Sequence, residues 1–144
     1  MSKAKVLIVE DEIITAAALR NALQEMGFSI CSLTTSGEKA IKTAEQEKPD
    51  IVLMDIKLPG EIDGIETARE IHSRFGIPII YMTGYSKETV LKQAGIQEPY
   101  EYLSKPVENL DMKKAIDSSL QKHKVDLGTK KDEQTETIDF DTKG

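Results

Sequence analysis

The sequence Ile51-Val52-Leu53-Met54-Asp55-Ile56 decides how the rest of the chain is interpreted. Its apolar residues, rich in Ile and Val, predict a short strand buried on both faces of a parallel sheet. The run stops at the carboxylate of Asp55, and Lys57-Leu58-Pro59-Gly60 follows as a loop. Because ligands bind at the carboxyl ends of strands in an open parallel sheet, we expect Asp55 to be functional. Taken alone, an Asp before a Pro-Gly loop is more often the start of a turn, so other residues have to support this interpretation.

Further apolar runs predict four more strands, at residues 6–9, 28–33, 77–82 and 100–103. Residues 28–33 mix Ser and Cys with apolar side chains, which is typical of a less buried edge strand. Helices are expected between the strands, and Gly27 is placed to end the first of them in a left-handed conformation. Thr35 and Glu38 form a capping-box pattern before the second helix, and Asp63 can cap the third. A short helix at residues 86–94 and a closing helix marked by Leu110, Ala115, Ile116 and Leu120 complete the pattern.

The alternation of strands and helices predicts an α/β fold with right-handed crossovers and helices on both faces of a parallel sheet. Five such units indicate a flavodoxin-like, doubly wound (βα)5 fold with strand order 2-1-3-4-5. In this order the first and third strands are neighbours. Glu10 and Asp11 follow the first strand and Asp55 ends the third, so we expect the three carboxylates to converge.

The composition of the 144-residue chain suits one domain, since 39% of the residues are hydrophobic and 31% are charged. We expect this domain to span residues 1–123 and a polar, aperiodic tail or linker to follow at residues 124–144. A formal net charge of −6 without a Lys/Arg cluster argues against direct binding to nucleic acid or to a membrane surface. The single cysteine, Cys31, and an N-terminal apolar run too short for a signal peptide or membrane span predict a cytoplasmic location.

Three converging carboxylates repel one another and raise each other's pKa unless a cation offsets their charge. Oxygen ligands indicate a hard ion. Mg²⁺ fits best, because it binds through one or two carboxylates and keeps its other positions for water, carbonyl and phosphate oxygens. His72 and His123 fall on predicted helices away from the strand ends, so we do not expect them to be ligands.

Beside a hard cation, the carboxylate of Asp55 can act as a nucleophile toward phosphorus and form an aspartyl-phosphate. A transferring phosphoryl group spreads its negative charge over three oxygens, so hydroxyl, amide or cationic groups must surround it. Thr83 and Lys105 offer such groups at the ends of the fourth and fifth predicted strands. Taken alone, Thr83 would be a turn hydroxyl and Lys105 a solvated surface lysine. Their common position with Asp55 supports a site.

Four motifs occur together at these strand ends: Val9-Glu10-Asp11, Asp55, Thr83-Gly84 and Tyr102-Leu103-Ser104-Lys105-Pro106. With them, about residues 4 to 123 resemble a response-regulator receiver domain of two-component phosphorelay signalling. The resemblance implies that a histidine kinase or a phosphotransfer protein donates a phosphoryl group to Asp55. It also implies a signalling phosphoacceptor that catalyses only its own phosphorylation and dephosphorylation, and not an enzyme with a separate substrate.

The resemblance also implies a ligand set for Mg²⁺. Asp11 and Asp55 would bind the ion directly together with the backbone carbonyl of Lys57, while Glu10 contributes at longer reach. Two features depart from the simplest receivers: Glu10 replaces the commoner Asp, and the loop at residues 57–62 is one residue longer. We expect neither to remove phosphoacceptance.

A conformational switch is implied in the same way. Thr83 would turn toward the phosphoryl group, and an aromatic side chain would move into the vacated space; Tyr102 is the candidate, with Tyr100 and Tyr85 as the alternatives. This movement would change the surface formed by the helix at residues 86–94, the last strand and the last helix. Lys57 and Tyr85 occupy positions that tune phosphoryl lifetime in the family. The resemblance further implies a cis bond between Lys105 and Pro106.

Two other classes of protein were weighed against this one. A phosphatase or phosphotransferase with an aspartyl-phosphate intermediate is weaker, because Asp55-Ile56-Lys57 lacks the second carboxylate that haloacid-dehalogenase-like enzymes use as a general acid. A flavin-binding, flavodoxin-like carrier is weaker because no Ser/Thr/Gly-rich phosphate loop follows the first strand. Under the leading interpretation, the further partners are a downstream output protein, a fused sensor or kinase module, or a second copy of the chain.

Overall fold

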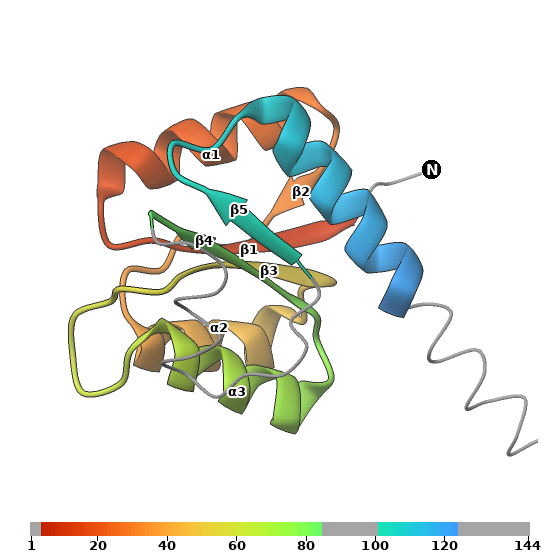
Figure 1. Ribbon diagram of the computed structural model, residues 1–144. Coiled ribbons are helices and arrows are strands. Elements are labelled where there is room, and N and C mark those ends of the chain that lie inside the picture. Colours follow the sequence, from red (N-terminus) through yellow and green to blue (C-terminus); the bar gives the residue numbers. More distant parts are fainter. Residues whose placement is uncertain (1–3, 85–100, 124–144) are drawn as a thin grey trace, which may run out of the picture.

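The computed structural model describes residues 4–84 and 101–123. One parallel sheet has the strand order β2-β1-β3-β4-β5, which confirms the predicted flavodoxin-like order 2-1-3-4-5 (Figure 1). Its strands are β1 (Lys5–Val9), β2 (Ser29–Ile30), β3 (Ile51–Asp55), β4 (Ile79–Thr83) and β5 (Glu101–Ser104). The predicted edge strand at residues 28–33 is thus reduced to two residues, with one further bridge between Val9 and Thr34.

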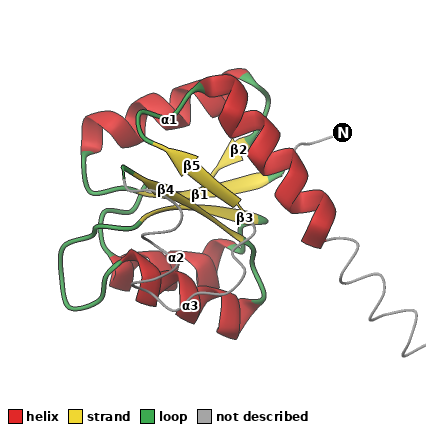
Figure 2. Cartoon of the chain, viewed as in Figure 1, coloured by secondary structure: helices red, strands yellow, loops and turns green. Residues whose placement is uncertain are grey.

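Helices cover both faces of the sheet (Figure 2). They are α1 (Ile13–Glu25), α2 (Gly37–Glu47), α3 (Gly64–Phe75) and a C-terminal helix over residues 109–123. The structure places α1 and the C-terminal helix on one face, and α2 and α3 on the other. The predicted helix at residues 86–94 and the predicted tail at residues 124–144 lie outside the described residues.

Two hydrophobic layers, one on each side of the sheet, hold these helices in place. Alternate residues of β1 enter opposite layers: Val6 and Ile8 contact the residues of α1, whereas Leu7 and Val9 contact those of α2 and α3. All four are fully buried. An unbroken apolar run is therefore what a strand covered on both faces requires. None of the helices in the described ranges is long and apolar enough to cross a membrane.

The helix ends follow local chemistry, with one correction. Asp63 caps α3 as predicted, and Gly27 follows α1 with a φ of 98° as predicted. The prediction that Thr35 caps α2 is wrong, because the side chain of Ser36 accepts the hydrogen bond from the backbone N–H of Lys39. Both residue types can cap a helix, so the sequence pattern alone allowed either. Gly37, the first helical residue, packs against Thr67 of α3, where a side chain would not fit.

Candidate functional site

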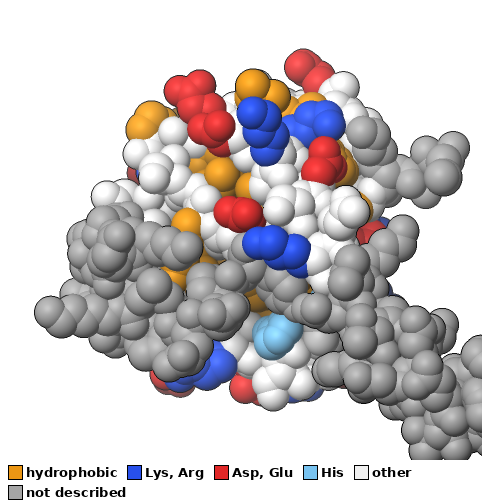
Figure 3. All heavy atoms as spheres, turned by 45° about the vertical axis from the view of Figure 1, so that its right-hand side comes forward, with side chains coloured by type: hydrophobic (Ala, Val, Ile, Leu, Met, Phe, Trp, Pro, Cys, Tyr) orange, Lys and Arg blue, Asp and Glu red, His pale blue; other side chains and the backbone are white. Residues whose placement is uncertain are grey.

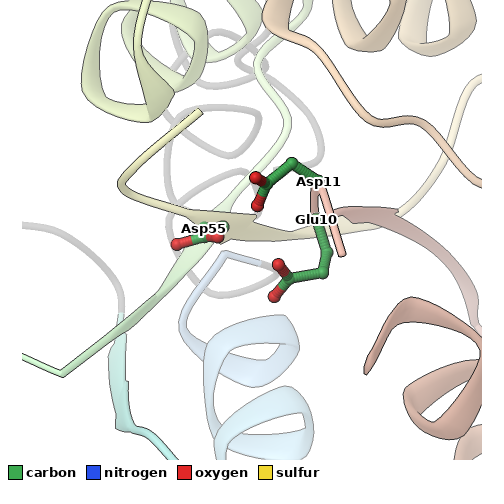
Figure 4. Close-up of side chains that lie close together, drawn as sticks. All are labelled: Glu10, Asp11 and Asp55. Carbon is green, nitrogen blue, oxygen red and sulfur yellow. The ribbon is translucent and has the colours of Figure 1, made fainter. Parts of the chain in front are cut away.

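Three carboxylates meet at the carboxyl ends of β1 and β3 (Figure 4). The two strands are paired in parallel with Val9 opposite Met54, so the residues that follow on each strand are neighbours. Glu10, Asp11 and Asp55 each offer a carboxylate oxygen, and these oxygens lie within 4.8 Å of one another. The predicted convergence is therefore present.

Burial makes this cluster electrostatically costly. Glu10 is 1% exposed and Asp55 is 5% exposed, whereas Asp11 is exposed to solvent. Burial raises the pKa of Glu10 to about 7, and the charge of Asp55 acts in the same direction. Lys105 and the backbone N–H of Glu12 act in the opposite direction without cancelling the effect. The pocket thus favours an added positive charge.

Lys105 supplies one positive charge from the end of β5. Its Nζ atom lies 3.1 Å from Oδ2 of Asp55 and 3.2 Å from Oε1 of Glu10. Burial alone would lower the pKa of this ammonium group, but the hydrogen bonds and charges of Asp55 and Glu10 outweigh it, so its pKa is raised. The backbone N–H of Lys105 donates to the carbonyl of Thr83. The bond from Lys105 to Pro106 is cis, as predicted.

Two other predicted residues, Thr83 and Lys57, lie beside the pocket. Thr83 is buried at the last position of β4, one residue beyond Met82, which pairs with Asp55. Lys57 follows Asp55 at the start of the loop, and its backbone N–H donates to Oδ1 of Asp55 at 3.2 Å. This N–H therefore faces the carboxylate of Asp55.

Tyr102 is half-buried on β5 and lies beside the ring of Tyr81, with centroids 5.7 Å apart and planes at 56°. Tyr81 is the direct partner of Tyr102 in the sheet and lies two residues before Thr83 on β4. Alternation along the strands places these three side chains on the same face of the sheet. Tyr85, the alternative candidate Tyr100, and the helix at residues 86–94 lie outside the described residues.

The donor set fits a hard divalent cation. It consists of carboxylate oxygens, two of them from buried residues, and the excess of negative over positive charge there would attract such an ion. His72 does not approach this set, because its Nδ1 atom contacts the carbonyl of Ile77 at 3.2 Å, at the other end of β4. The acidic cluster could therefore bind a metal ion.

The comparisons with known proteins agree with this geometry. The family model of the response regulator receiver domain matches residues 6–117. The chain belongs to this family. Its members are signalling phosphoacceptors and not classical enzymes, which decides against both alternative classes.

Relatives of the receiver domain occur within longer proteins. The chain is 37% identical over 113 residues to the transcriptional regulatory protein PdtaR of Mycobacterium tuberculosis, a match that covers 78% of this chain and 55% of PdtaR. The chain thus spans about half the length of the curated relatives it matches.

Solved structures give the same assignment. The signal receiver domain of a modulated diguanylate cyclase from Desulfovibrio desulfuricans G20 is 35% identical, with a TM-score of 0.79 over 85% of this chain and 98% of that one. The N-terminal domain of a response regulator/sensory box/GGDEF 3-domain protein from Carboxydothermus hydrogenoformans is 26% identical, with a TM-score of 0.76 over the same shares of the two chains.

An apolar surface beside the receiver pocket was not predicted from the sequence. Ile13 and Ile14 on α1 are 59% and 86% exposed, and Leu110 on the C-terminal helix is 62% exposed. A groove of about 560 Å³ runs from Ile14 to Lys105. In the upper half of Figure 3, the half that α1 and the C-terminal helix form in Figure 1, hydrophobic side chains reach the surface among charged ones. The signal was the pair Ile13-Ile14, because adjacent residues of a helix cannot both face the core.

Proposed function

We propose that this receiver domain accepts a phosphoryl group on Asp55 from a histidine kinase or a phosphotransfer protein and thereby controls a signalling partner. The observation that carries the proposal is the buried carboxylate of Asp55, held 3.1 Å from the ammonium group of Lys105 beside two further carboxylates. Like charges held together cost stability, and a site retains them where function requires them.

The chemistry follows from the groups around Asp55. An oxygen of its carboxylate attacks the phosphorus of a phosphohistidine; the new O–P bond forms as the N–P bond breaks, and the imidazole nitrogen keeps the bonding electron pair. The ammonium group of Lys105, the hydroxyl of Thr83 and the backbone N–H of Lys57 stabilise the negative phosphoryl oxygens. Hydrolysis of the aspartyl-phosphate by water resets the domain.

Mg²⁺ is the proposed cofactor. Glu10, Asp11 and Asp55, together with the backbone carbonyl of Lys57, would hold it. When bound, the ion neutralises charge on the carboxylates and on the phosphoryl oxygens. Lys105 contacts Glu10 and Asp55 through a side chain that is 31% exposed, so it can move as charge is added to the pocket.

The readout uses Thr83 and Tyr102. A phosphoryl group adds about two negative charges, and the hydroxyl of Thr83 turns toward it. Tyr102 then moves into the vacated space and changes the surface that β5 forms with the C-terminal helix and the predicted helix at residues 86–94. A downstream output protein, a fused sensor or kinase module, or a second copy of the chain would bind this surface.

The phosphodonor docks on the apolar surface at the start of α1, where Ile13 and Ile14 are exposed. This surface adjoins the pocket, because the groove beside Ile14 is also lined by Lys105 and Glu10. Burying apolar side chains next to Asp55 would bring a donor helix within reach of the carboxylate without a large electrostatic contribution.

We assign residues 1–123 to the receiver domain and residues 124–144 to a linker or extension, in a cytoplasmic protein without direct nucleic-acid contacts.

The experiment that tests the phosphoacceptor proposal is incubation of the chain with acetyl phosphate, with and without Mg²⁺. We expect one phosphoryl group per chain in the presence of Mg²⁺, and none on Asp55→Asn. Labelling that is equal in wild type and Asp55→Asn would contradict the proposal. Continuous release of phosphate from small phosphate esters by the wild-type chain would favour the alternative phosphatase class and contradict the proposal.

A further inference from the structure

Gly64, the first residue of α3, lies directly behind the proposed phosphoacceptor. A Cβ atom at this position would overlap the carbonyl oxygen of Asp55 and lie 2.8 Å from the Cα atom of Ile56. A residue with a side chain would therefore force the backbone of Asp55 or the start of α3 to move. The absence of a side chain at Gly64 is what lets the helix begin in contact with the strand end.

The start of α3 is itself held firmly. Oδ1 of Asp63 accepts a hydrogen bond from the backbone N–H of Glu66 at 2.9 Å, and Oε1 of Glu66 accepts one from the backbone N–H of Asp63 at 3.3 Å. The hydroxyl of Thr67 donates to the carbonyl of Asp63 at 2.7 Å. These bonds fix the turn from which the backbone N–H of Gly64 donates to the carbonyl of Ile56 at 2.9 Å.

The strand end is held from the other side as well. The backbone N–H of Ile56 donates to the carbonyl of Met82 on β4 at 3.3 Å. The backbone that carries Asp55 is therefore clamped between β4 and the first turn of α3. The direction of the Asp55 carboxylate depends on both contacts, because side-chain direction follows the backbone.

We propose that Gly64 and its cap Asp63 are positioning residues for the reaction at Asp55. They touch neither the phosphoryl group nor the metal, and they act by fixing the backbone from which the nucleophile projects. This inference rests on the proposed function. A shift of about 1 Å in a reacting group can cost on the order of 100-fold in rate, so a loosened clamp should be visible in kinetics.

The test loosens the clamp without adding a clash. Asp63→Ala removes the acceptor that caps α3, Asp63→Asn keeps an acceptor and removes the charge, and Ser36→Ala removes the matched cap of α2. We expect Asp63→Ala to be phosphorylated by acetyl phosphate at least about fivefold more slowly and to bind Mg²⁺ more weakly. Asp63→Asn and Ser36→Ala should stay within about twofold of wild type, although Ser36→Ala and Asp63→Ala should lower Tm alike.

A second pair of variants compares the two ends of α3. Gly76 ends this helix with a φ of 69°, and a Cβ atom there would meet no atom within 4 Å. Gly76→Ala therefore strains the backbone without touching Asp55, whereas Gly64→Ala displaces it. We expect Gly64→Ala to lose at least about 20-fold in phosphorylation rate at a temperature where both variants are folded, and Gly76→Ala to lose less than about twofold.

The outcomes separate this inference from the proposed function. If wild type accepts a phosphoryl group and Asp63→Ala reacts equally fast, or if Ser36→Ala slows as much as Asp63→Ala, the positioning role is overturned. If wild type accepts no phosphoryl group, the proposed function fails. The Mg²⁺ affinities of Asp63→Ala and Asp63→Asn then test only whether the cap of α3 positions the carboxylate of Asp55: equal affinities would overturn that role.

Discussion

Two glutamates near opposite ends of β1, Glu47 and Glu10, have pKa values shifted in opposite directions. Near the amino end, Glu47 accepts hydrogen bonds from the backbone N–H and the hydroxyl of Ser32, at 3.1 Å and 2.7 Å, and these bonds lower its pKa. At the carboxyl end, burial raises the pKa of Glu10 to about 7. The first carboxylate helps the chain fold, whereas the second resists its own ionisation. This difference indicates that the functional site lies at the carboxyl end of β1, where ionising the buried carboxylate of Glu10 costs free energy.

The neighbours of each cluster sharpen this contrast. Near the amino end, Asp50 accepts a hydrogen bond from the backbone N–H of Lys5 at 2.8 Å, and the ammonium group of Lys5 donates to the carbonyl of Glu47 at 2.9 Å. At the carboxyl end, three carboxylates lie together, and Lys105 forms ion pairs with two of them, Glu10 and Asp55. A second cation would offset the remaining negative charge of these carboxylates.

Replacing Lys105 should give the largest effect on stability. In Lys105→Met the buried carboxylates of Glu10 and Asp55 lose their cation. We expect the free energy of unfolding without Mg²⁺ to fall by about 2–3 kcal/mol, below the range for fully buried pairs because Lys105 is partly exposed. Urea denaturation at pH 7.5 measures this. Lys113→Met, which removes an exposed pair with Asp117, should change it by less than about 0.5 kcal/mol. Equal effects would show that the pocket carries no special electrostatic cost.

The second effect is a pH dependence. Because the pKa of Glu10 is raised from 4.5 to about 7 in the folded state, the folded chain binds more protons than the unfolded chain between these values. The free energy of unfolding should therefore fall as pH rises from 4.5 to 7, by about 2 kcal/mol relative to Glu10→Gln. Urea denaturation of both proteins in EDTA across this range checks the sign. A wild-type stability that rises in parallel with that of Glu10→Gln would contradict the raised pKa.

The third effect is on Mg²⁺ affinity, which should depend on a carboxylate at the carboxyl end of β1 and not on one near its amino end. Asp11→Asn removes a carboxylate of the acidic cluster, and we expect the affinity for Mg²⁺ to fall about tenfold or more, equivalent to about 1.4 kcal/mol. Asp50→Asn makes the same chemical change near the amino end of β1 and should leave the affinity unchanged. Titration calorimetry measures both. Unchanged affinity in Asp11→Asn would remove this residue from the ligand set.

The smallest effect is expected at Glu47. Glu47→Gln keeps an oxygen that can accept from the backbone N–H of Ser32, but it replaces the oxygen that accepts from the Ser32 hydroxyl with an NH2 group and loses the charge, at an exposed position. We expect the free energy of unfolding at pH 7 to fall by no more than about 0.5–1 kcal/mol. A loss as large as that of Lys105→Met would contradict the proposed difference between the two ends.

Much of the fold could be predicted from local patterns, and the failures have local causes. The runs at residues 6–9 and 51–54 predicted buried strands because strands covered on both faces need no polar residues. The cap of α2 was placed one residue early, because Thr35 and Ser36 are adjacent hydroxyl residues and both types can cap a helix. A local pattern does not distinguish between two such neighbours.

Part of the candidate site could likewise be predicted from local patterns, and part could not. The carboxylates and Lys105 could be found because each lies at or within two residues of the end of a predicted strand, and parallel strands bring such residues to one edge. The clamp at Gly64 could not be found, because a glycine after a capping residue fits any helix start. The exposure of Leu110 could not be read from an apolar periodicity that it shares with buried residues such as Ile116.

We propose that the three carboxylates are held together, at a cost in stability, so that Asp55 can accept a phosphoryl group. The most direct measurement is intact-mass and peptide-mapping mass spectrometry of the chain after reaction with acetyl phosphate and Mg²⁺. We predict a single added phosphoryl group that is released by hydroxylamine and maps to the peptide containing Asp55. A phosphoryl group located on a Ser, Thr or His, or no mass increase under these conditions, would contradict the account.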